Sequence, residues 1–307
     1  MKRFLKTGVI IAALCLVICT CFLATVKPWE ASDAINSDTA AAASAAATEP
    51  EVTVTEFSDG TLMEVYFFQA GKADATLLTT ENYTVLIDCG VKGFGQTILD
   101  YLAEKEIDHI DYLIVTHFDQ DHVGGAAKVI NNIPVYNVLQ NNSPKDSSEY
   151  EKYVKALTNA GIEPVTVTES YSFTLDGVSF TVDAAKALHF ADDESNNSSL
   201  LVTVVNGENT FLFMGDAQTE RLEEYLEGTV VDCDVLKVPH HGGEEILMEA
   251  LIRAAKPELA VITSSDEEPE AASTTAVLDA AEIETYLTRE GDILMVSDGT
   301  TISVVEK

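Results

Sequence analysis

Basic residues are scarce in this sequence of 307 residues, which has 18 Lys and Arg against 51 Asp and Glu and a formal net charge of −33. The imbalance is not confined to a tail, because residues 61–307 hold 44 acidic and 14 basic side chains, a net charge of −30. A surface this negative repels polyanions at long range. Extended nucleic-acid binding is therefore disfavoured, although a phosphate-containing substrate held by metal ions is compatible with the charge.

Cysteines are also few, and three of the five, Cys15, Cys19 and Cys21, lie close to the N-terminus. Cys89 and Cys233 are not spaced for a cysteine metal site, which excludes a zinc finger or a similar module. Each lies in an apolar, strand-like stretch and is expected to pack as a small hydrophobic side chain. A disulfide between them in an oxidising compartment is the alternative.

The N-terminus carries Lys2, Arg3 and Lys6 ahead of an uncharged run that extends to Val26. This pattern predicts a signal peptide or N-terminal membrane anchor over residues 1–30, with the body of the protein extracytoplasmic. The run has no convincing lipobox and no clear cleavage site. Residues 31–60 are rich in Ala, Ser, Thr and acidic residues, which predicts a flexible linker ahead of one domain over 61–307.

The body alternates stretches of strand and helix periodicity. Strands are expected over 62–70, 74–80, 83–88, 111–117, 133–140, 163–170, 171–177, 178–186, 199–207, 210–216 and 233–240, and helices over 95–106, 125–132, 147–161 and 217–228. The remainder reads helix, strand, helix, strand, strand, and hairpin turns are expected at 206–209 and 297–301. The pattern predicts an α/β (α+β) fold in which two mixed sheets lie between helix layers, one sheet from each half of the chain.

The stretch THFDQDHVGG, residues 116–125, crowds together four side chains that bind metals, His117, Asp119, Asp121 and His122. Alternate side chains of an extended segment share one side, so the first three are expected together, with His122 turning in as the chain bends. Gly124 and Gly125 are expected to allow a sharp turn. Buried carboxylates need compensating cations, and mixed nitrogen and oxygen ligands suit zinc, with manganese or iron as alternatives. The other interpretation is an acidic surface loop.

One short loop cannot enclose two metal ions, so further ligands must come from other strand ends. Asp88 ends the apolar stretch TVLID and is expected to orient ligands. Asp216 ends FLFMGD, where it either bridges two cations or caps a helix. His240 and His241 end DVLKVPHH, where one is expected to bind metal while the other acts on the substrate.

The motifs HxDxDHxGG, LIDCG upstream, FMGDA downstream and LKVPHHGG beyond it resemble the metallo-β-lactamase superfamily over nearly all of residues 61–307. The ComEC-type branch is the most similar, because it has Asp in place of the second His, here Asp119, and Asn in an NxxSL pattern, here Asn196. The resemblance implies an αββα four-layer sandwich with a dinuclear centre at one edge of the sheets. It also implies two divalent metal ions, zinc or manganese.

The metal ligands implied by the resemblance are His117, Asp119, Asp121, His122, Asp216 and His241. Asp216 would bridge the two ions. His240 and Asp121 are expected to be catalytic, His240 by stabilising charge or donating a proton. Asp88 and Asn196 are expected to lie behind the ligands, with His189 as the alternative to Asn196 for completing the first site.

The chain also departs from the branch that it resembles. It reads HHGGEEIL where related sequences usually give HHGS, and SSDEEPEA where many relatives have a Gly-His-Pro segment. Acidic groups near the expected site weaken the case for a DNA substrate. Lys237, two residues before Pro239, either points into the site and pairs with an anion or lies on the surface.

These expectations lead to a metal-dependent hydrolase in which a hydroxide activated by two metal ions attacks a phosphodiester or related ester outside the cell. The expected partner is a small-molecule or envelope-polymer ester, together with the membrane if residues 1–30 are uncleaved. A catalytically silent metal-binding or sensing module of the same fold is the alternative. A purely structural metal site is disfavoured, because such sites are usually closed by four protein ligands.

Overall fold

The computed structural model describes residues 61–187, 189–191 and 193–305. The predicted signal peptide or membrane anchor over 1–30 and the predicted linker over 31–60 lie outside the described residues, so both stay predictions. Within the described ranges, no helix combines the length and the apolar character that a bilayer span requires. All of the elements given below belong to the domain predicted over 61–307.

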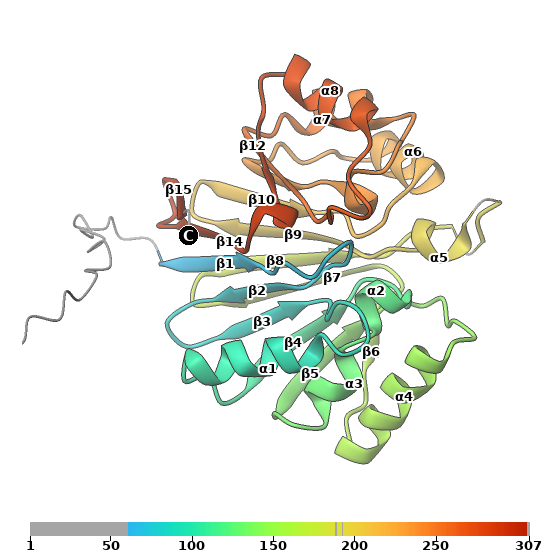
Figure 1. Cartoon of the computed structure of the whole chain (residues 1–307), viewed down its shortest axis with the longest axis vertical. Coiled ribbons are helices and arrows are strands. Elements are labelled where there is room, and N and C mark those ends of the chain that lie inside the picture. The colour runs from blue at the N-terminus through green and yellow to red at the C-terminus, as the bar shows by residue number, and fades with distance from the viewer. Residues whose placement is uncertain (1–60, 188, 192, 306–307) are drawn as a thin grey trace, which may run out of the picture. The chain divides into compact units, whose positions relative to one another are not determined.

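The strands form two mixed sheets (Figure 1). The first sheet has eight strands in the order β15 (Ile302–Val305), β14 (Ile293–Ser297), β1 (Met63–Phe67), β2 (Thr76–Thr79), β3 (Thr84–Ile87), β4 (Ile110–Val115), β5 (Val135–Gln140) and β6 (Val165–Thr166). The second has seven in the order β13 (Glu284–Leu287), β12 (Leu259–Ile262), β11 (Val235–Lys237), β10 (Asn209–Phe213), β9 (Leu201–Asn206), β8 (Val178–Asp183) and β7 (Ser170–Leu175). Two mixed sheets were predicted, and this prediction is confirmed.

Helices cover the outer face of each sheet (Figure 1). The longer helices are α1 (Gly95–Glu104), α3 (Ala126–Ile130) and α4 (Ser148–Ala160) on the first sheet, and α6 (Thr219–Glu227), α7 (Met248–Ala255) and α8 (Ala272–Ala280) on the second. Ile98 and Leu102 of α1 pack into the first outer core, and Leu222 of α6 and Leu251 of α7 into the second. The layers therefore run helix, sheet, sheet, helix, which confirms the αββα sandwich.

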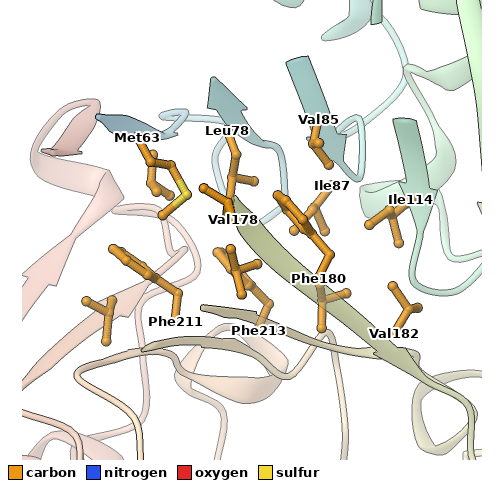
Figure 2. Packing of buried hydrophobic residues seen from close by; sticks show 14 of the residues in the cluster. Met63, Leu78, Val85, Ile87, Ile114, Val178, Phe180, Val182, Phe211 and Phe213 are labelled. Carbon is orange, nitrogen blue, oxygen red and sulfur yellow. The ribbon is translucent and has the colours of Figure 1, made fainter. Parts of the chain in front are cut away.

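A third apolar core fills the space between the two sheets (Figure 2). Because successive side chains of a strand point to opposite faces, Val178, Phe180 and Val182 of β8 all enter this core, whereas Ser179 between them is exposed. Phe211 of β10 enters it by the same alternation from the neighbouring part of the sheet. Each large apolar side chain buried here stabilises the fold by about 1.5–3 kcal/mol.

The prediction that each half of the chain supplies one sheet is wrong. The C-terminal strand β14 pairs antiparallel with the N-terminal strand β1, from Met63 opposite Ser297 to Phe67 opposite Ile293, and β15 follows it into the first sheet. In this position beside β1, Met295 of β14 packs into the core between the two sheets. Partner choice of this kind depends on tertiary packing and leaves no local signal in the sequence.

Several element boundaries also differ from expectation. The strand expected over 163–170 shrinks to the two residues of β6, both exposed, at the edge of the sheet. Three strands, not two, follow α8, because β13 pairs with β12 despite its mostly half-buried side chains. Short helices α2 (Gln120–Val123) and α5 (Glu194–Asn197) were not predicted. Cys89 and Cys233 are both free and buried, so the prediction of small core side chains is confirmed.

Candidate metal centre

The predicted site residues come from the carboxyl ends of strands in both sheets. β3 and β4 are parallel neighbours in the first sheet, as are β10 and β11 in the second. Asp88 follows β3, the segment from His117 follows β4, Asp216 follows β10, and His240 with His241 follows β11. Parallel strands place their carboxyl ends at the same edge of a sheet, so the fold gathers residues that are far apart in the sequence at one edge.

The loop after β4 differs in detail from the predicted extended segment. Asp119 has extended backbone dihedrals and precedes α2, and its carbonyl accepts hydrogen bonds from the backbone N–H groups of His122 and Val123. Asp121 is therefore the second residue of a helical turn and not part of an alternating strand. The helical turn still directs Asp121 and His122 toward the same cluster.

Gly124 and Gly125 serve a different purpose from the predicted sharp turn. Both have ordinary right-handed helical φ values of −58° and −85°. A Cβ on Gly124 would lie 2.5 Å from the backbone nitrogen of Lys92, and one on Gly125 would lie 2.2 Å from the carbonyl oxygen of Cys89. The glycines are required because the loop after β3 crosses the junction of α2 and α3 at backbone contact distance.

Four side chains form the tightest part of the site. The candidate ligand atoms of Asp121, His122, Asp216 and His241 all lie within 4.8 Å of one another. Nε2 of His241 is 3.1 Å from Oδ2 of Asp216 and 3.4 Å from Oδ2 of Asp121, and Nε2 of His122 is 3.2 Å from Oδ1 of Asp216. Two imidazoles and two carboxylates at these separations can surround one cation.

His117 and Asp119 lie next to this cluster, close to Asp216. Nε2 of His117 lies 4.0 Å from Oδ2 of Asp216 and 4.0 Å from Oδ1 of Asp119. Asp119 is also held by the ammonium group of Lys145 and the hydroxyl of Ser195. Burial opposes ionisation of Asp119, but the charge of His117 and the hydrogen bond from Lys145 lower the pKa of this carboxyl. These separations of 4.0 Å are wider than those of 3.1–3.4 Å within the first group.

Unpaired buried nitrogen and oxygen atoms show that the cluster suits cations. Nε2 of His117, His122 and His241 and Oδ1 of Asp216 are buried and have no hydrogen-bond partner. Buried polar atoms without partners are costly, and such atoms in native proteins need an explanation. Their convergence on one space, as three imidazole nitrogens and one carboxylate oxygen, fits bound divalent metal ions.

The charges of neighbouring groups decide the pKa values in the cluster. Burial favours neutral His241, but the carboxylate of Asp216 outweighs it and the pKa rises to about 10. The pKa of His122 is raised in the same way, against burial, whereas burial and the charge of His122 lower the pKa of His117 to about 4. Burial opposes ionisation of Asp121, but the neighbouring His241 and His122 prevail, and the pKa of this carboxyl falls to about 2. The carboxylates thus draw positive charge into the space, and metal binding would displace protons from it.

The two adjacent histidines have separate places. His241 is buried, and its Nδ1 lies 3.0 Å from Oγ1 of Thr263, which leaves Nε2 facing the cluster. His240 is a quarter exposed and belongs to neither His/Asp cluster found among the described residues. Both have left-handed backbone dihedrals, with φ of 50° and 54°, and Gly242 follows with φ of 71°. Consecutive left-handed residues are strained, and the two ring planes lie at 54° to each other.

Asn196 and His189 were the alternatives for completing the first site. Asn196 is buried in α5, its Oδ1 has no hydrogen-bond partner, and its Nδ2 lies 3.5 Å from Nε2 of His240. His189 is exposed, and its Nδ1 lies 3.3 Å from Oε1 of Glu194. Asn196 is therefore the buried one of the two, and which of them completes the first site stays a prediction.

Asp88 lies behind His122. Its Oδ2 is 2.8 Å from Nδ1 of His122 and accepts a hydrogen bond of 2.6 Å from Oγ1 of Thr116, while Oδ1 accepts one from the Thr116 backbone N–H. Asp88 is fully buried and has a φ of 57°. The carboxylate therefore fixes the ring of His122 with Nε2 toward Asp216.

Replacement of Asp88 by asparagine is expected to weaken metal binding by roughly 10–100-fold, because Asn tolerates the left-handed backbone but lacks the charge that orients His122. Competition against a zinc chelator would measure the change. Asp176→Asn is the matched control, since Asp176 is another left-handed aspartate, with φ of 48°, and forms its hydrogen bonds with Thr80 and Asn82. An affinity equal to that of the control would show that Asp88 does not orient a ligand.

Two residues behind the cluster complete the network, and each leaves only a weak signal in the sequence. Asp74 was not predicted: it is buried, pairs with Lys237, accepts 2.6 Å from Oγ1 of Thr263, and lies 3.4 Å from Nδ1 of His241. Its one signal is a charged residue placed shortly before an apolar strand. Lys237 had two interpretations, and the structure places it at the site: its side chain is 2% exposed, with Nζ 3.9 Å from Oδ1 of Asp216.

Comparisons with known proteins agree with this geometry. The family described as the metallo-beta-lactamase superfamily matches residues 69–264. ComE operon protein 3 of Bacillus subtilis is 28% identical over 170 residues, which is 55% of this chain and 22% of that protein. Recombination protein 2 of Haemophilus influenzae is 27% identical over 206 residues, 66% of this chain and 24% of that protein. The matches therefore span less than a quarter of the length of either relative.

A solved structure supports the fold independently. YhfI from Bacillus subtilis, described as a metallo-beta-lactamase fold protein, aligns with a TM-score of 0.52 and 12% identity over 78% of this chain and 100% of that chain. The match of the family, the αββα layers and the order of the motifs all lead to one assignment. This chain belongs to the metallo-beta-lactamase superfamily, and the ComEC-type resemblance of its motifs is confirmed by its curated relatives.

Proposed function

We propose that this protein is a metal-dependent hydrolase that acts on phosphodiester or related ester bonds. The observation that carries the proposal is the convergence of unpaired Nε2 atoms of three histidines with Oδ1 of Asp216 in one buried space at a sheet edge. Members of the superfamily are commonly hydrolases, which supports the reaction class. Fold alone does not fix a substrate, so the bond type rests on the chemistry of the site.

The donor set fits two divalent ions, with zinc or manganese as the metals suited to these ligands. The ligands proposed for the first ion are His117, Asp119 and Asp216, and those for the second are Asp121, His122, Asp216 and His241. When bound, such a pair of ions makes a water-derived nucleophile accessible near neutral pH and stabilises developing oxygen charge.

Other side chains of the site orient the ligands and the reacting groups. Asp74 and Asp88 hold the Nδ1 sides of His241 and His122, so both rings keep Nε2 toward the cluster. Asp121 lies 3.4 Å from Nε2 of His241 and is expected to orient the attacking group. His240 stands beside the cluster, partly exposed, where it is expected to donate a hydrogen bond or a proton to the leaving oxygen.

The acidic surface and the N-terminus support a particular setting. A net charge of −30 over residues 61–307 favours a small-molecule or envelope-polymer ester over an extended nucleic acid. The apolar run within residues 1–30 supports an extracytoplasmic location, secreted or attached to the membrane. Because the matches cover less than a quarter of the ComEC-type relatives, what those proteins do as a whole is not carried over to this chain.

Metal content and turnover on the same purified chain would test the proposal. We expect about two zinc or manganese ions per chain by mass spectrometry and hydrolysis of bis(p-nitrophenyl) phosphate or p-nitrophenylphosphorylcholine. Turnover should disappear when a chelator removes the ions and return when they are added back. Full metal content without hydrolysis of either ester would contradict the proposal and favour a metal-binding or sensing role. A folded chain without metal would overturn the site itself.

A further inference from the structure

The segment after the histidine pair places an acidic side chain where it does not meet solvent. HHGGEEIL has two adjacent glutamates, and they differ sharply: Glu244 is exposed, whereas the side chain of Glu245 is 3% exposed. Oε1 of Glu245 lies 3.1 Å from Nδ1 of His240, and Oε2 accepts a hydrogen bond of 3.3 Å from Oγ1 of Thr219. Glu245 is therefore a buried partner of His240 and not part of an acidic rim.

The contacts of His240 select one arrangement of its ring protons. A carboxylate can only accept, so Nδ1 of His240 must carry the hydrogen that faces Glu245. Nε2 then presents a lone pair toward Nδ2 of Asn196, which is 3.5 Å away and can donate. The amide of Gln218 also lies 3.2 Å from Nδ1 of His240. If this amide is turned over, its oxygen faces Nδ1–H of His240, and the Nδ1–H tautomer is unchanged. Glu245 and Asn196 thus favour the same tautomer from opposite sides of the ring.

Because Gly243 has no side chain, the ring of His240 has room beside it. A Cβ at position 243 would be 3.2 Å from Nδ1 and 3.0 Å from the carbonyl oxygen of His240, which is too close without displacement. The usual HHGS sequence of the resembled branch would place a side chain there. The two departures of this chain, a glycine at 243 and a glutamate at 245, therefore act on the same ring: one makes room for it, and the other holds it.

We propose that Glu245 is a positioning residue that holds His240 in the Nδ1–H tautomer, which leaves Nε2 without a proton on the side of Asn196. This proposal rests on the proposed hydrolase function. During ester cleavage, the unprotonated Nε2 takes a proton from the attacking water and passes it to the leaving oxygen as the bond between that oxygen and phosphorus breaks. Glu245 keeps its hydrogen bond to Nδ1–H throughout and balances the charge of the doubly protonated ring.

A purely structural role is the competing explanation, because Glu245 also connects Thr219 at the start of α6 to the loop after β11. The two explanations differ in what they predict for the ring of His240. A structural anchor would affect stability and all substrates equally. A positioning residue would change the tautomer of one histidine and the dependence of turnover on the leaving group.

The experiment compares the zinc-loaded wild-type chain with Glu245→Met, which keeps side-chain volume without an acceptor, and Glu245→Gln, whose amide oxygen can still accept. Glu244→Gln is the exposed control. Ring nitrogen chemical shifts of the six histidines are recorded by NMR, and His240 is assigned from a His240→Gln variant. We expect the Nδ1–H pattern in wild type, Glu245→Gln and the control, and a mixed or Nε2–H pattern in Glu245→Met.

Turnover gives the second reading. Glu245→Met should lower kcat by roughly 10–100-fold for a phenyl ester, a poor leaving group, and by a much smaller factor for the matching p-nitrophenyl ester, with KM little changed. Equal losses on both esters, or an unchanged His240 pattern in a folded Glu245→Met chain, would overturn the role of Glu245. Absence of turnover in wild type would overturn the proposed function instead, and the NMR comparison would still decide whether Glu245 sets the tautomer.

Discussion

Asp216→Asn is expected to lower turnover by about 10³-fold or more, equivalent to about 4 kcal/mol, and to reduce the metal content below two ions per chain. Asp216 is the side chain that both halves of the candidate centre share: its carboxylate lies 3.2 Å from His122, 3.1 Å from His241 and 4.0 Å from His117. An amide has one neutral oxygen in place of two charged ones and cannot bridge two cations.

The pKa of Asp216 supports the same expectation. Burial alone would raise it, but the neighbouring charges of His122 and His241 hold it well below the usual range of a carboxyl. The side chain of Asp216 is therefore ionised. Asparagine has a similar size but no charge, so the substitution removes the charge with little change of volume. Loss of function should then appear without gross unfolding.

Mass spectrometry of metal content and initial rates on bis(p-nitrophenyl) phosphate would measure the effect of Asp216→Asn. Asp279→Asn, an exposed aspartate near the end of α8, is the control for a charge-neutralising substitution elsewhere. Circular dichroism would establish that both variants fold. Two bound metal ions and near wild-type rates in Asp216→Asn would show that Asp216 does not bridge the two ions.

The motif residues could be placed from the sequence because each follows an apolar strand, and the fold gathers these strand ends at one edge. His117, Asp216 and His241 needed only the strand pattern and a resemblance in motif order. The prediction of extended backbone through Asp121 failed because Asp119 caps a helical turn through its carbonyl, which bonds to His122 and Val123. A four-residue helix has no periodicity that a sequence pattern could reveal.

Asp74 and Glu245 show what lies beyond the reach of the sequence. Asp74 precedes β2 and meets Thr263, which lies 189 positions further along the chain. Glu245 reads as one of many acidic surface residues in a chain of net charge −33. In both cases the informative fact is burial next to a histidine, and burial of a charged residue depends on which distant segments cover it. The same excess of acidic residues conceals the few that have partners.

Lys237→Met is expected to destabilise the fold by about 3–5 kcal/mol, the usual effect of removing one partner of a buried ion pair. The side chain of Lys237 is 2% exposed and that of Asp74 is 8% exposed, and Nζ also donates 3.2 Å to the carbonyl oxygen of Gly215. Burial opposes ionisation of Asp74, but Lys237 lowers the pKa of this carboxyl strongly. Without Lys237, the carboxylate would remain buried beside Asp216 with too little positive charge.

Urea unfolding of the metal-free chain would measure the change, because chelation separates fold stability from metal affinity. Lys256→Met is a matched control, because Lys256 pairs with Asp232 at 2.9 Å while the two side chains are 65% and 69% exposed. Loss of this exposed pair should cost no more than about 1 kcal/mol.

Adding Asp74→Asn to Lys237→Met removes the stranded charge but keeps an acceptor for Thr263. The double variant should therefore lose less stability than the sum of the single ones, by about 1–3 kcal/mol. If Lys237→Met lowers the free energy of unfolding no more than Lys256→Met does, the ion pair of Lys237 with Asp74 does not stabilise the metal centre. The acidic cluster must then be stabilised by His122 and His241.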